Sequence, residues 1–279
     1  MNTQKIATCA VAIGSATIVW AVLAWQPSPA AAASNWEQIK SSGKLRMGVV
    51  PYPPNSFIDT KTGKWEGFTI DMANDIAKVM GVTAEFVETT FGNSPIDLQA
   101  NKIDIQFGLQ ATPLRAMAID FAGPVYELSF STINNKNFKT TSWEDYNKTT
   151  VKIAVPTGGS AAVAARMFAP KAERVELKTY ADTIAAVQAG RADTLVNMSI
   201  ANLVAKVRNP ELGDYVQPKP IKALPSHAGM RFDDDRRFRD FINRWAEFHR
   251  LSGTVTDWVK KSLIATGISE SDIPDDMQF

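Results

Sequence analysis

A basic side chain stands in the first turn of a helix predicted to begin at Thr112. Thr112 is a typical N-cap residue and Pro113 a typical first helical residue, so free backbone N–H groups are expected there. Arg115 adds a positive charge that opposes the helix dipole by up to about 1 kcal/mol. The arrangement is explained if the N–H groups and the guanidinium bind one carboxylate or similar anion. The alternative is an exposed arginine in a surface salt bridge.

Residues 1–33 have the features of a secretory signal peptide. They carry one charged residue, an apolar run over residues 6–25, and the small residues Ala31 and Ala33 before a cleavage site at Ser34. Removal of this segment would leave a secreted mature chain. Because the apolar run is long enough to span a bilayer, retention as an uncleaved membrane anchor is the alternative.

The charge balance and the cysteine count exclude several classes of protein. The chain has 30 basic and 29 acidic side chains, and the predicted signal peptide contains one of the basic ones, so the mature chain is neutral. A neutral chain is a poor candidate for nucleic-acid binding. Cys9 is the only cysteine, and its removal would exclude disulfides, thiolate nucleophiles and cysteine metal sites. No second long apolar stretch follows, and we expect a soluble mature protein.

Strand and helix patterns alternate along the chain. The predicted strands lie at 44–50, 82–87, 103–107, 151–155, 194–196 and 228–230. The predicted helices lie at 70–80, 94–100, 161–168, 234–252 and 254–266. The apolar face predicted for the helix at 234–252 comprises Phe238, Phe241, Ile242, Trp245, Phe248 and Leu251. Repeated strand–helix–strand units imply a parallel sheet with right-handed crossovers.

The pattern also repeats in its details. The segment Leu-Gln-Ala-Asn-Lys-Ile-Asp at 98–104 is echoed by Val-Gln-Ala-Gly-Arg-Ala-Asp at 187–193. A helix end, a tight turn and a buried strand recur with the same chemistry. The echo favours two similarly built α/β lobes over one continuous sheet.

Six motifs, in order over nearly the whole mature chain, resemble those of periplasmic solute-binding proteins that serve polar amino-acid ABC transporters. They are KLRMGV at 44–49, YPP at 52–54, GFTIDM at 67–72, KID at 102–104, TPLR at 112–115 and IDF at 119–121. The resemblance implies a periplasmic binding protein type II fold, with two similar α/β lobes joined by two hinge strands. Lobe one would comprise residues 35–130 and 222–279, and lobe two residues 131–221, with crossings near 130–134 and 217–222.

The same resemblance assigns binding residues in lobe one. Arg115 would clamp the α-carboxylate of the ligand, helped by Thr112 and by backbone groups of Gly108 and Gln110. Family members often have Thr or Ser at the position of Gln110, where this chain departs from the pattern.

Other groups would reach the ligand from across the cleft or from its sides. The glycine turn at 157–160 opens a helix, and the N–H groups of Gly158 and its neighbours, with the hydroxyl of Ser160, would bind the same carboxylate from lobe two. Tyr52 and Phe91 stand where the family places aromatic rings against the ligand's side chain. The alternatives are plain turn architecture for the glycines and ordinary packing for the rings.

One position departs from the amino-acid binders of the family. They usually hold the ligand's α-ammonium with an aspartate just after the strand that here is 194–196, but this chain has Asn197 and then Met198 at the aspartate position. A thioether cannot replace a carboxylate, because an ammonium buried without a counter-charge is costly. Either another acid such as Glu127 takes over, or the ligand has no α-ammonium.

The resemblance therefore implies a periplasmic receptor that binds an amino acid or related small carboxylate by lobe closure and delivers it to the membrane permease of an ABC transporter. We expect a monomer without enzymatic activity and without a cofactor, a metal ion or a nucleic-acid partner. The chain has no Gly-x-x-x-x-Gly-Lys-Ser/Thr loop, so ATP would be used by the transporter.

Two other classes of protein remain open. Some secreted cyclohexadienyl dehydratases resemble this family, and such a lyase needs a general acid or base in the cleft. His227 and His249 lie outside the ligand motifs, whereas Glu127 is an acid near a hinge. The sensor domain of a signalling receptor would require a downstream membrane span or output domain, and neither is expected before Phe279.

Overall fold

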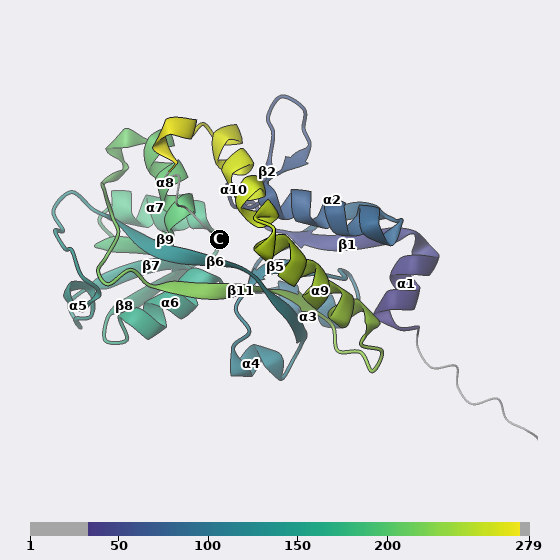
Figure 1. Ribbon diagram of the computed structural model, residues 1–279. Helices are drawn as coiled ribbons and strands as arrows, with labels where there is room; N and C mark the ends of the chain where they lie inside the picture. Colours follow the sequence, from purple (N-terminus) through teal and green to yellow (C-terminus); the bar gives the residue numbers. More distant parts are fainter. Residues whose placement is uncertain (1–32, 274–279) are drawn as a thin grey trace, which may run out of the picture. The chain divides into compact units, whose positions relative to one another are not determined.

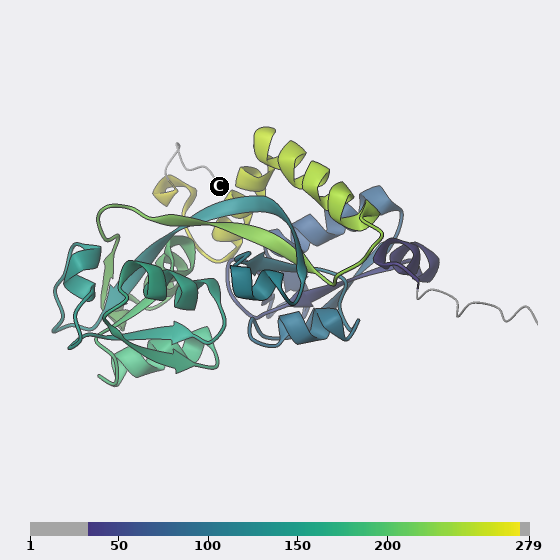
Figure 2. The same cartoon turned by 90° about the horizontal axis from the view of Figure 1, so that it is seen from below.

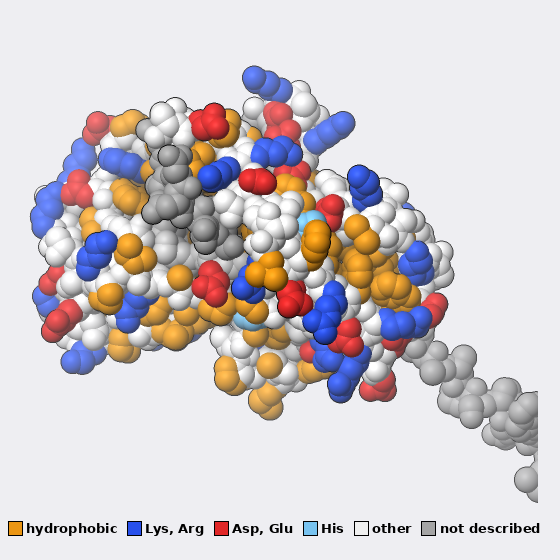
Figure 3. Space-filling model, viewed as in Figure 1, with side chains coloured by type: hydrophobic (Ala, Val, Ile, Leu, Met, Phe, Trp, Pro, Cys, Tyr) orange, Lys and Arg blue, Asp and Glu red, His pale blue; other side chains and the backbone are white. Residues whose placement is uncertain are grey.

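A computed structural model describes residues 33–273 of the chain. The predicted signal peptide at 1–33 thus lies, except for Ala33, outside the described residues. Within residues 33–273, no helix combines the length and the apolar character needed to cross a membrane. On the face in Figure 3, acidic and basic side chains are interspersed.

The described residues form ten α-helices and eleven strands. The helices are α1 (Asn35–Ser42), α2 (Phe68–Met80), α3 (Ser94–Gln99), α4 (Pro113–Ala116), α5 (Trp143–Tyr146), α6 (Ser160–Phe168), α7 (Tyr180–Gln188), α8 (Ser199–Arg208), α9 (Arg237–Leu251) and α10 (Thr254–Ala265). The strands are β1 (Lys44–Val49), β2 (Phe57–Ile58), β3 (Trp65–Glu66), β4 (Thr83–Glu88), β5 (Gln106–Leu109), β6 (Asp120–Asn134), β7 (Lys152–Pro156), β8 (Glu173–Leu177), β9 (Thr194–Met198), β10 (Asp214–Val216) and β11 (Ala223–Met230).

Two α/β lobes are joined by the long strands β6 and β11, as Figures 1 and 2 show. In lobe one, β1 pairs in parallel with β4, and β5 pairs with β11. In lobe two, β7 pairs in parallel with β8 and β9. Strand β6 pairs with β11 over residues 120–129 and with β9 over residues 130–134. The residue boundaries of the lobes, 35–130 with 222–279 and 131–221, stay a prediction.

The main sheet is mixed rather than parallel. Its strand order is β5-β11-β6-β9-β7-β8, with β10 also paired to β6. The predicted parallel pairing is confirmed for β1 with β4 and for β7 with its two neighbours. It is wrong for β6 and β11, which run antiparallel to each other and to the strands beside them. Strands that return from one lobe to the other must run in opposite directions, which accounts for the difference.

The echo between 98–104 and 187–193 corresponds to the same backbone arrangement in both lobes. The N–H of Arg46 donates to a carboxylate oxygen of Asp104 (2.8 Å), and the N–H of Asp104 donates to the carbonyl of Arg46 (2.8 Å). Likewise the N–H of Lys152 donates to Asp193 (2.8 Å), whose own N–H donates to Lys152 (2.9 Å). An aspartate therefore ties β1 to the segment before β5 in lobe one, and β7 to the segment before β9 in lobe two.

One part of the predicted core is wrong. Phe238, Ile242 and Trp245 of α9 are buried as expected, but Phe248 is 66% and Leu251 81% exposed. Successive inward positions of a helix are three or four residues apart, so the inward position after Trp245 falls at residue 249. His249 occupies it, where its ring lies against those of Trp245 and Trp258.

The aspartates of the two lobes differ in what else they hold. The side chain of Asp104 is 1% exposed and also accepts from the guanidinium of Arg46, whereas Lys152 pairs with exposed Glu173 instead. We expect Asp104→Ala to lower the free energy of unfolding by about 3–5 kcal/mol, because it leaves a partly buried cation unpaired. Asp193→Ala, the matched control, is expected to lower it by about 1 kcal/mol. Urea unfolding measures both changes. Equal losses of stability would show that the ion pair of Asp104 with Arg46 adds nothing beyond the backbone hydrogen bonds that both aspartates make.

Candidate functional site

Arg115 connects the two lobes. Thr112 caps α4, and its hydroxyl accepts from the N–H of Arg115 (3.3 Å), which confirms the expected start of this helix. One terminal nitrogen of the guanidinium donates to the carbonyl of Gln110 (3.1 Å). The other donates to the carbonyl of Gly158, which belongs to the turn before α6 in lobe two. The side chain therefore spans the junction between the lobes.

The guanidinium has neutral partners. Among residues 33–273 no carboxylate lies within ion-pair distance of Arg115, and the guanidinium donates to the backbone carbonyls of Gln110 and Gly158. Burial lowers the pKa of Arg115, and the positive charge of Arg166 lowers it further. A half-buried cation next to a second cation favours an anion as its additional partner.

The turn before α6 lies directly against lobe one. Gly158 has φ +71°, and a Cβ there would lie 2.9 Å from the Cα of Gly92, so a larger residue does not fit without a shift. Gly159 precedes Ser160, the first residue of α6, and no side chain caps this helix. The positive end of the helix dipole thus lies near the carbonyl that Arg115 contacts.

Three aromatic rings form a cluster that both lobes supply. The ring of Tyr52 lies edge-on to that of Phe91, with centroids 5.6 Å apart, and 5.4 Å from that of Tyr180. Phe91 also covers Gly108, where a Cβ would lie 3.3 Å from the ring. The glycine at position 108 has φ +85°, a backbone conformation that L side chains rarely adopt. Phe91 thus lies against three other residues assigned by the resemblance, which are Tyr52, Gly108 and Gly158.

Sequence reasoning missed Tyr180. The signal that identifies it is the Thr-x-x-Asp pattern at 179–182, which forms a capping box at the start of α7. A helix that follows a parallel strand starts at the carboxyl edge of the sheet, where open α/β sheets bind ligands. An aromatic residue at the first position of such a helix is therefore a candidate for ligand contact.

Asn197 and Met198 end β9 and are 0% and 4% exposed. The side-chain oxygen of Asn197 accepts the N–H of Met198 (2.9 Å), while its amide nitrogen has no partner among the described residues. The side-chain oxygen of buried Gln110 is also without a partner there. No hydrogen bond within residues 33–273 joins Asn197 or Met198 to Arg115.

Glu127 does not face this region. It is exposed on β6, between the buried residues Tyr126 and Leu128. Because successive side chains of a strand point to opposite faces, its carboxylate lies on the side away from the buried neighbours. Glu127 is thus poorly placed to provide the counter-charge missing at Met198.

His249 lies away from the site, whereas His227 pairs with Leu109, between Gly108 and Gln110. His249 pairs with Asp75 on the outer helices, at 3.2 Å. His227 lies on β11 beside Phe121, and burial lowers the pKa of its ring. Within residues 33–273 no group of three His, Cys, Asp or Glu side chains is arranged to hold a metal ion.

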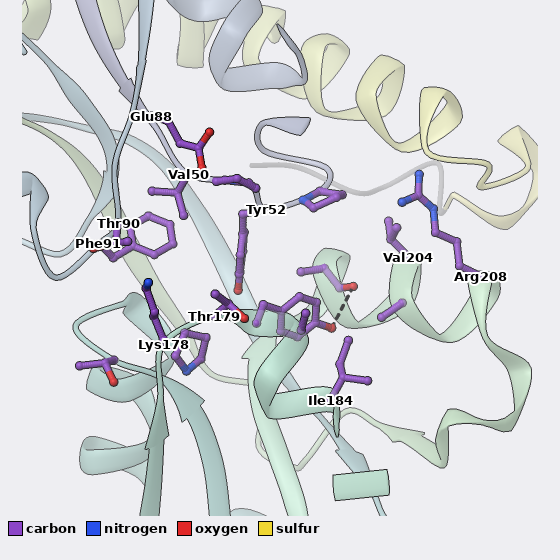
Figure 4. A pocket seen from close by; sticks show the side chains of 18 of the residues that line it. Val50, Tyr52, Glu88, Thr90, Phe91, Lys178, Thr179, Ile184, Val204 and Arg208 are labelled. Atoms are coloured by element: carbon purple, nitrogen blue, oxygen red, sulfur yellow. Dashed lines mark hydrogen bonds between the residues drawn. The ribbon is translucent and has the colours of Figure 1, made fainter. Parts of the chain in front are cut away.

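A cavity of about 650 Å³ opens beside the aromatic cluster (Figure 4). Lobe one lines it with Val50, Pro51, Tyr52, Pro53, Glu88, Thr89, Thr90 and Phe91. Lobe two lines it with Pro156, Thr157, Lys178, Thr179, Tyr180, Ala181, Ile184, Ala201, Val204, Ala205, Arg208, Asn209 and Leu212. Of the residues assigned by resemblance, Tyr52 and Phe91 belong to this lining, whereas Arg115 and Gly158 do not.

Comparison with known proteins places these features in one family. A sequence model of the bacterial extracellular solute-binding proteins, family 3, matches residues 45–261. The glutamine-binding protein of Geobacillus stearothermophilus is 32% identical over 165 residues, which are 57% of this chain and 62% of that protein. GlnH, an ABC transporter glutamine-binding protein of Bacillus subtilis, is 33% identical over 178 residues, 58% of this chain and 65% of GlnH. The matches thus span less than two thirds of these relatives.

An enzyme and a solved structure are also similar. Cyclohexadienyl dehydratase of Pseudomonas aeruginosa is 24% identical over 229 residues, 80% of this chain and 83% of the enzyme. The crystal structure of the ancestral amino acid-binding protein AncCDT-1, a precursor of cyclohexadienyl dehydratase, is 32% identical with a TM-score of 0.71, and covers 82% of this chain and 100% of its own.

The contact between Gly158 and Gly92 yields a test of lobe approach. We expect Gly158→Ala to hold the lobes apart and to increase the radius of gyration, because the added methyl group meets the backbone of lobe one. Gly190→Ala is the control, since Gly190 has a similar φ of +68° but no atom within 4 Å of an added Cβ. Small-angle X-ray scattering measures both variants, and identical profiles would show that the contact does not limit closure.

Proposed function

The chain belongs to the bacterial extracellular solute-binding proteins, family 3, and on that premise we propose that it is the solute receptor of an ABC transporter. It binds a small carboxylate between its two lobes and delivers it to a membrane permease. The family is extracellular, and periplasmic location after cleavage of residues 1–33 is part of the proposal.

The observation that supports this function best is the position of Arg115. Its guanidinium is half-buried, donates to carbonyls of both lobes, and lies near the N-terminus of α6. A carboxylate bound there would gain charge-assisted hydrogen bonds from lobe one and helix N–H groups from lobe two. Such a ligand makes its full set of contacts only when the lobes are together, so it stabilises the closed state.

The proposed ligand lacks the α-ammonium of an amino acid. Met198 carries no charge. The carboxylate of Glu127 lies on the exposed face of β6, opposite the buried side chains of Tyr126 and Leu128. An ammonium buried at the end of β9 would therefore have no counter-charge from either residue. This reasoning separates the proposed ligand from glutamine, which is named for two of the relatives.

A lyase resembling cyclohexadienyl dehydratase is the second candidate, because that enzyme is similar over 80% of this chain. Glu88 and Lys178 are the titratable carboxylate and amine that line the cavity, and both are exposed. A general acid or base acts within hydrogen-bond reach of a substrate held away from water, whereas these two side chains are exposed to solvent. The receptor function is therefore preferred. Incubation with a cyclohexadienyl carboxylate tests the alternative, and its dehydration would favour the lyase.

Arg115 provides the main test of the receptor function. The ligand is first identified by mass spectrometry of small molecules that copurify with the protein. We then expect Arg115→Ala and Arg115→Lys to weaken its binding by about 2–5 kcal/mol, because lysine cannot donate two parallel hydrogen bonds. Arg191→Ala, at an exposed position of lobe two, is the control. Calorimetry on folded variants measures the change, and affinities within about threefold of wild type would contradict the carboxylate clamp.

Met198 tests the absence of an α-ammonium. We expect Met198→Asp to improve the binding of common amino acids and to weaken that of the copurified carboxylate, since it adds a negative charge. Met198→Asn is the control, because asparagine has nearly the same shape as aspartate but carries no charge. Thermal-shift measurements with the standard amino acids and their deaminated analogues report both effects. Tight binding of one amino acid by the wild type, with its deaminated analogue inactive, would show that the ammonium is recognised after all.

A further inference from the structure

The cavity beside the aromatic cluster adjoins the proposed carboxylate site through Thr157 and Phe91. Thr157 lines the cavity, and the next residue, Gly158, accepts from Arg115. Phe91 lines the cavity as well, and its ring lies against the backbone at Gly108 and Gly159. The cavity is therefore a space next to Arg115 that could take the remaining atoms of a ligand whose carboxylate binds there.

The walls of this cavity are mostly apolar. Proline, valine, alanine and leucine side chains provide much of the surface from both lobes. The hydroxyl of Tyr180 is already engaged, since it donates to Asn202 (2.9 Å) and lies 3.3 Å from the carbonyl of Ala201. Burial raises the pKa of Tyr52 and of Tyr180, so both rings are neutral at physiological pH. The interior thus presents mainly aromatic and aliphatic surface, with the threonines at 89, 90, 157 and 179 and Asn209 as its uncharged polar lining.

The charged side chains lie toward the ends of the cavity. In Figure 4, Glu88 and Lys178 lie at one end and Arg208 at the other. All three residues are exposed to solvent. The Nε of Arg208 donates to the carbonyl of Thr266, 3.1 Å away. A second charged or strongly polar group of a ligand would therefore be separated from these partners by apolar wall, and burying it there would be unfavourable.

We propose that the ligand is a monocarboxylate whose other end is a bulky apolar group, aryl or branched alkyl. The carboxylate binds Arg115, and the apolar group fills the cavity against Tyr52 and Tyr180. This inference rests on the proposed function and adds the chemical class of the ligand. A cavity of about 650 Å³ suits such a group, because small-molecule pockets measure about 300–1,000 Å³.

A panel of carboxylates with different tails tests the inference. The probes are 3-phenylpropanoate and 4-methylpentanoate with apolar tails, propanoate with a short one, and 4-carbamoylbutanoate with a polar amide. We expect the two apolar probes to bind at least about tenfold more tightly than the others in calorimetry, because they bury more apolar surface. Equal affinities, or preference for the amide, would overturn the apolar class while leaving the carboxylate receptor intact. If no probe binds and the copurified ligand lacks a carboxylate, the apolar class and the carboxylate receptor are both overturned.

Two variants locate the tail in the cavity. Ala205 on α8 lines the cavity, whereas Val207 on the same helix is 43% exposed and does not. We expect Ala205→Phe to weaken 3-phenylpropanoate at least about tenfold and to leave 4-carbamoylbutanoate within about threefold, since it occupies only the tail space. Val207→Phe, the matched control, should change neither affinity. Equal loss for both probes, or loss in the control, would contradict the placement.

An enlarged cavity provides the opposite change if the larger side chain prevents folding. Val204 is buried in the cavity wall. We expect Val204→Ala to increase the affinity for 3-(2-naphthyl)propanoate relative to 3-phenylpropanoate by about threefold or more, because it makes room for the second ring. An unchanged ratio in a folded variant would place the tail elsewhere.

Discussion

One strand, β6, forms hydrogen bonds in both lobes, and the relative position of the two halves of the site depends on it. Its first ten residues pair with β11 and its last five with β9, so a single segment belongs to both lobes. At the change of partner, Ser129 donates to Ser199 (2.9 Å), and Gln217 donates to both hydroxyls at 3.2 and 3.1 Å. Both crossings and the start of α8 are thus connected by side chains. Motion of one lobe relative to the other must be absorbed next to this network.

The sequence predicts those parts of the structure that depend on neighbours along the chain. The cap at Thr112 and the helix end and turn of the two echoed segments were accessible because each uses residues a few positions apart. The hydrogen bonds of Asp104 to Arg46 and of Asp193 to Lys152 join distant positions and were not predicted. The family motifs also predict the two lobes. Phe248 and Leu251 were misplaced because a list of apolar residues does not specify the helix angle at which each one lies. In the structure His249 faces inward instead of Phe248 and Leu251, which the apolar pattern alone does not predict.

The cavity illustrates what no local pattern reports. Tyr180 contacts Tyr52 from the other lobe, and Thr157 and Ala205 reach the same space from separate elements. Only the packing of α7 and α8 against the loops after β1 and β4 brings them together. The residues assigned by resemblance therefore include the proposed carboxylate clamp but little of the cavity lining. Specificity in such a protein resides in contacts between segments distant in sequence.

The path of the chain through the lobes also bears on its biogenesis. Helices α5 to α8 and strands β7 to β9 follow one another without interruption, so this part can acquire all its internal contacts as soon as it has been synthesised. The other lobe begins first yet is completed last, because α9 packs on β6 and α10 packs on α2 only after the C-terminal segment has emerged. Its long-range contacts require slow loop closure. While the chain is still being synthesised, the aromatic and aliphatic surface that α9 and α10 later cover is therefore exposed. Chaperones and export factors bind chains in this state.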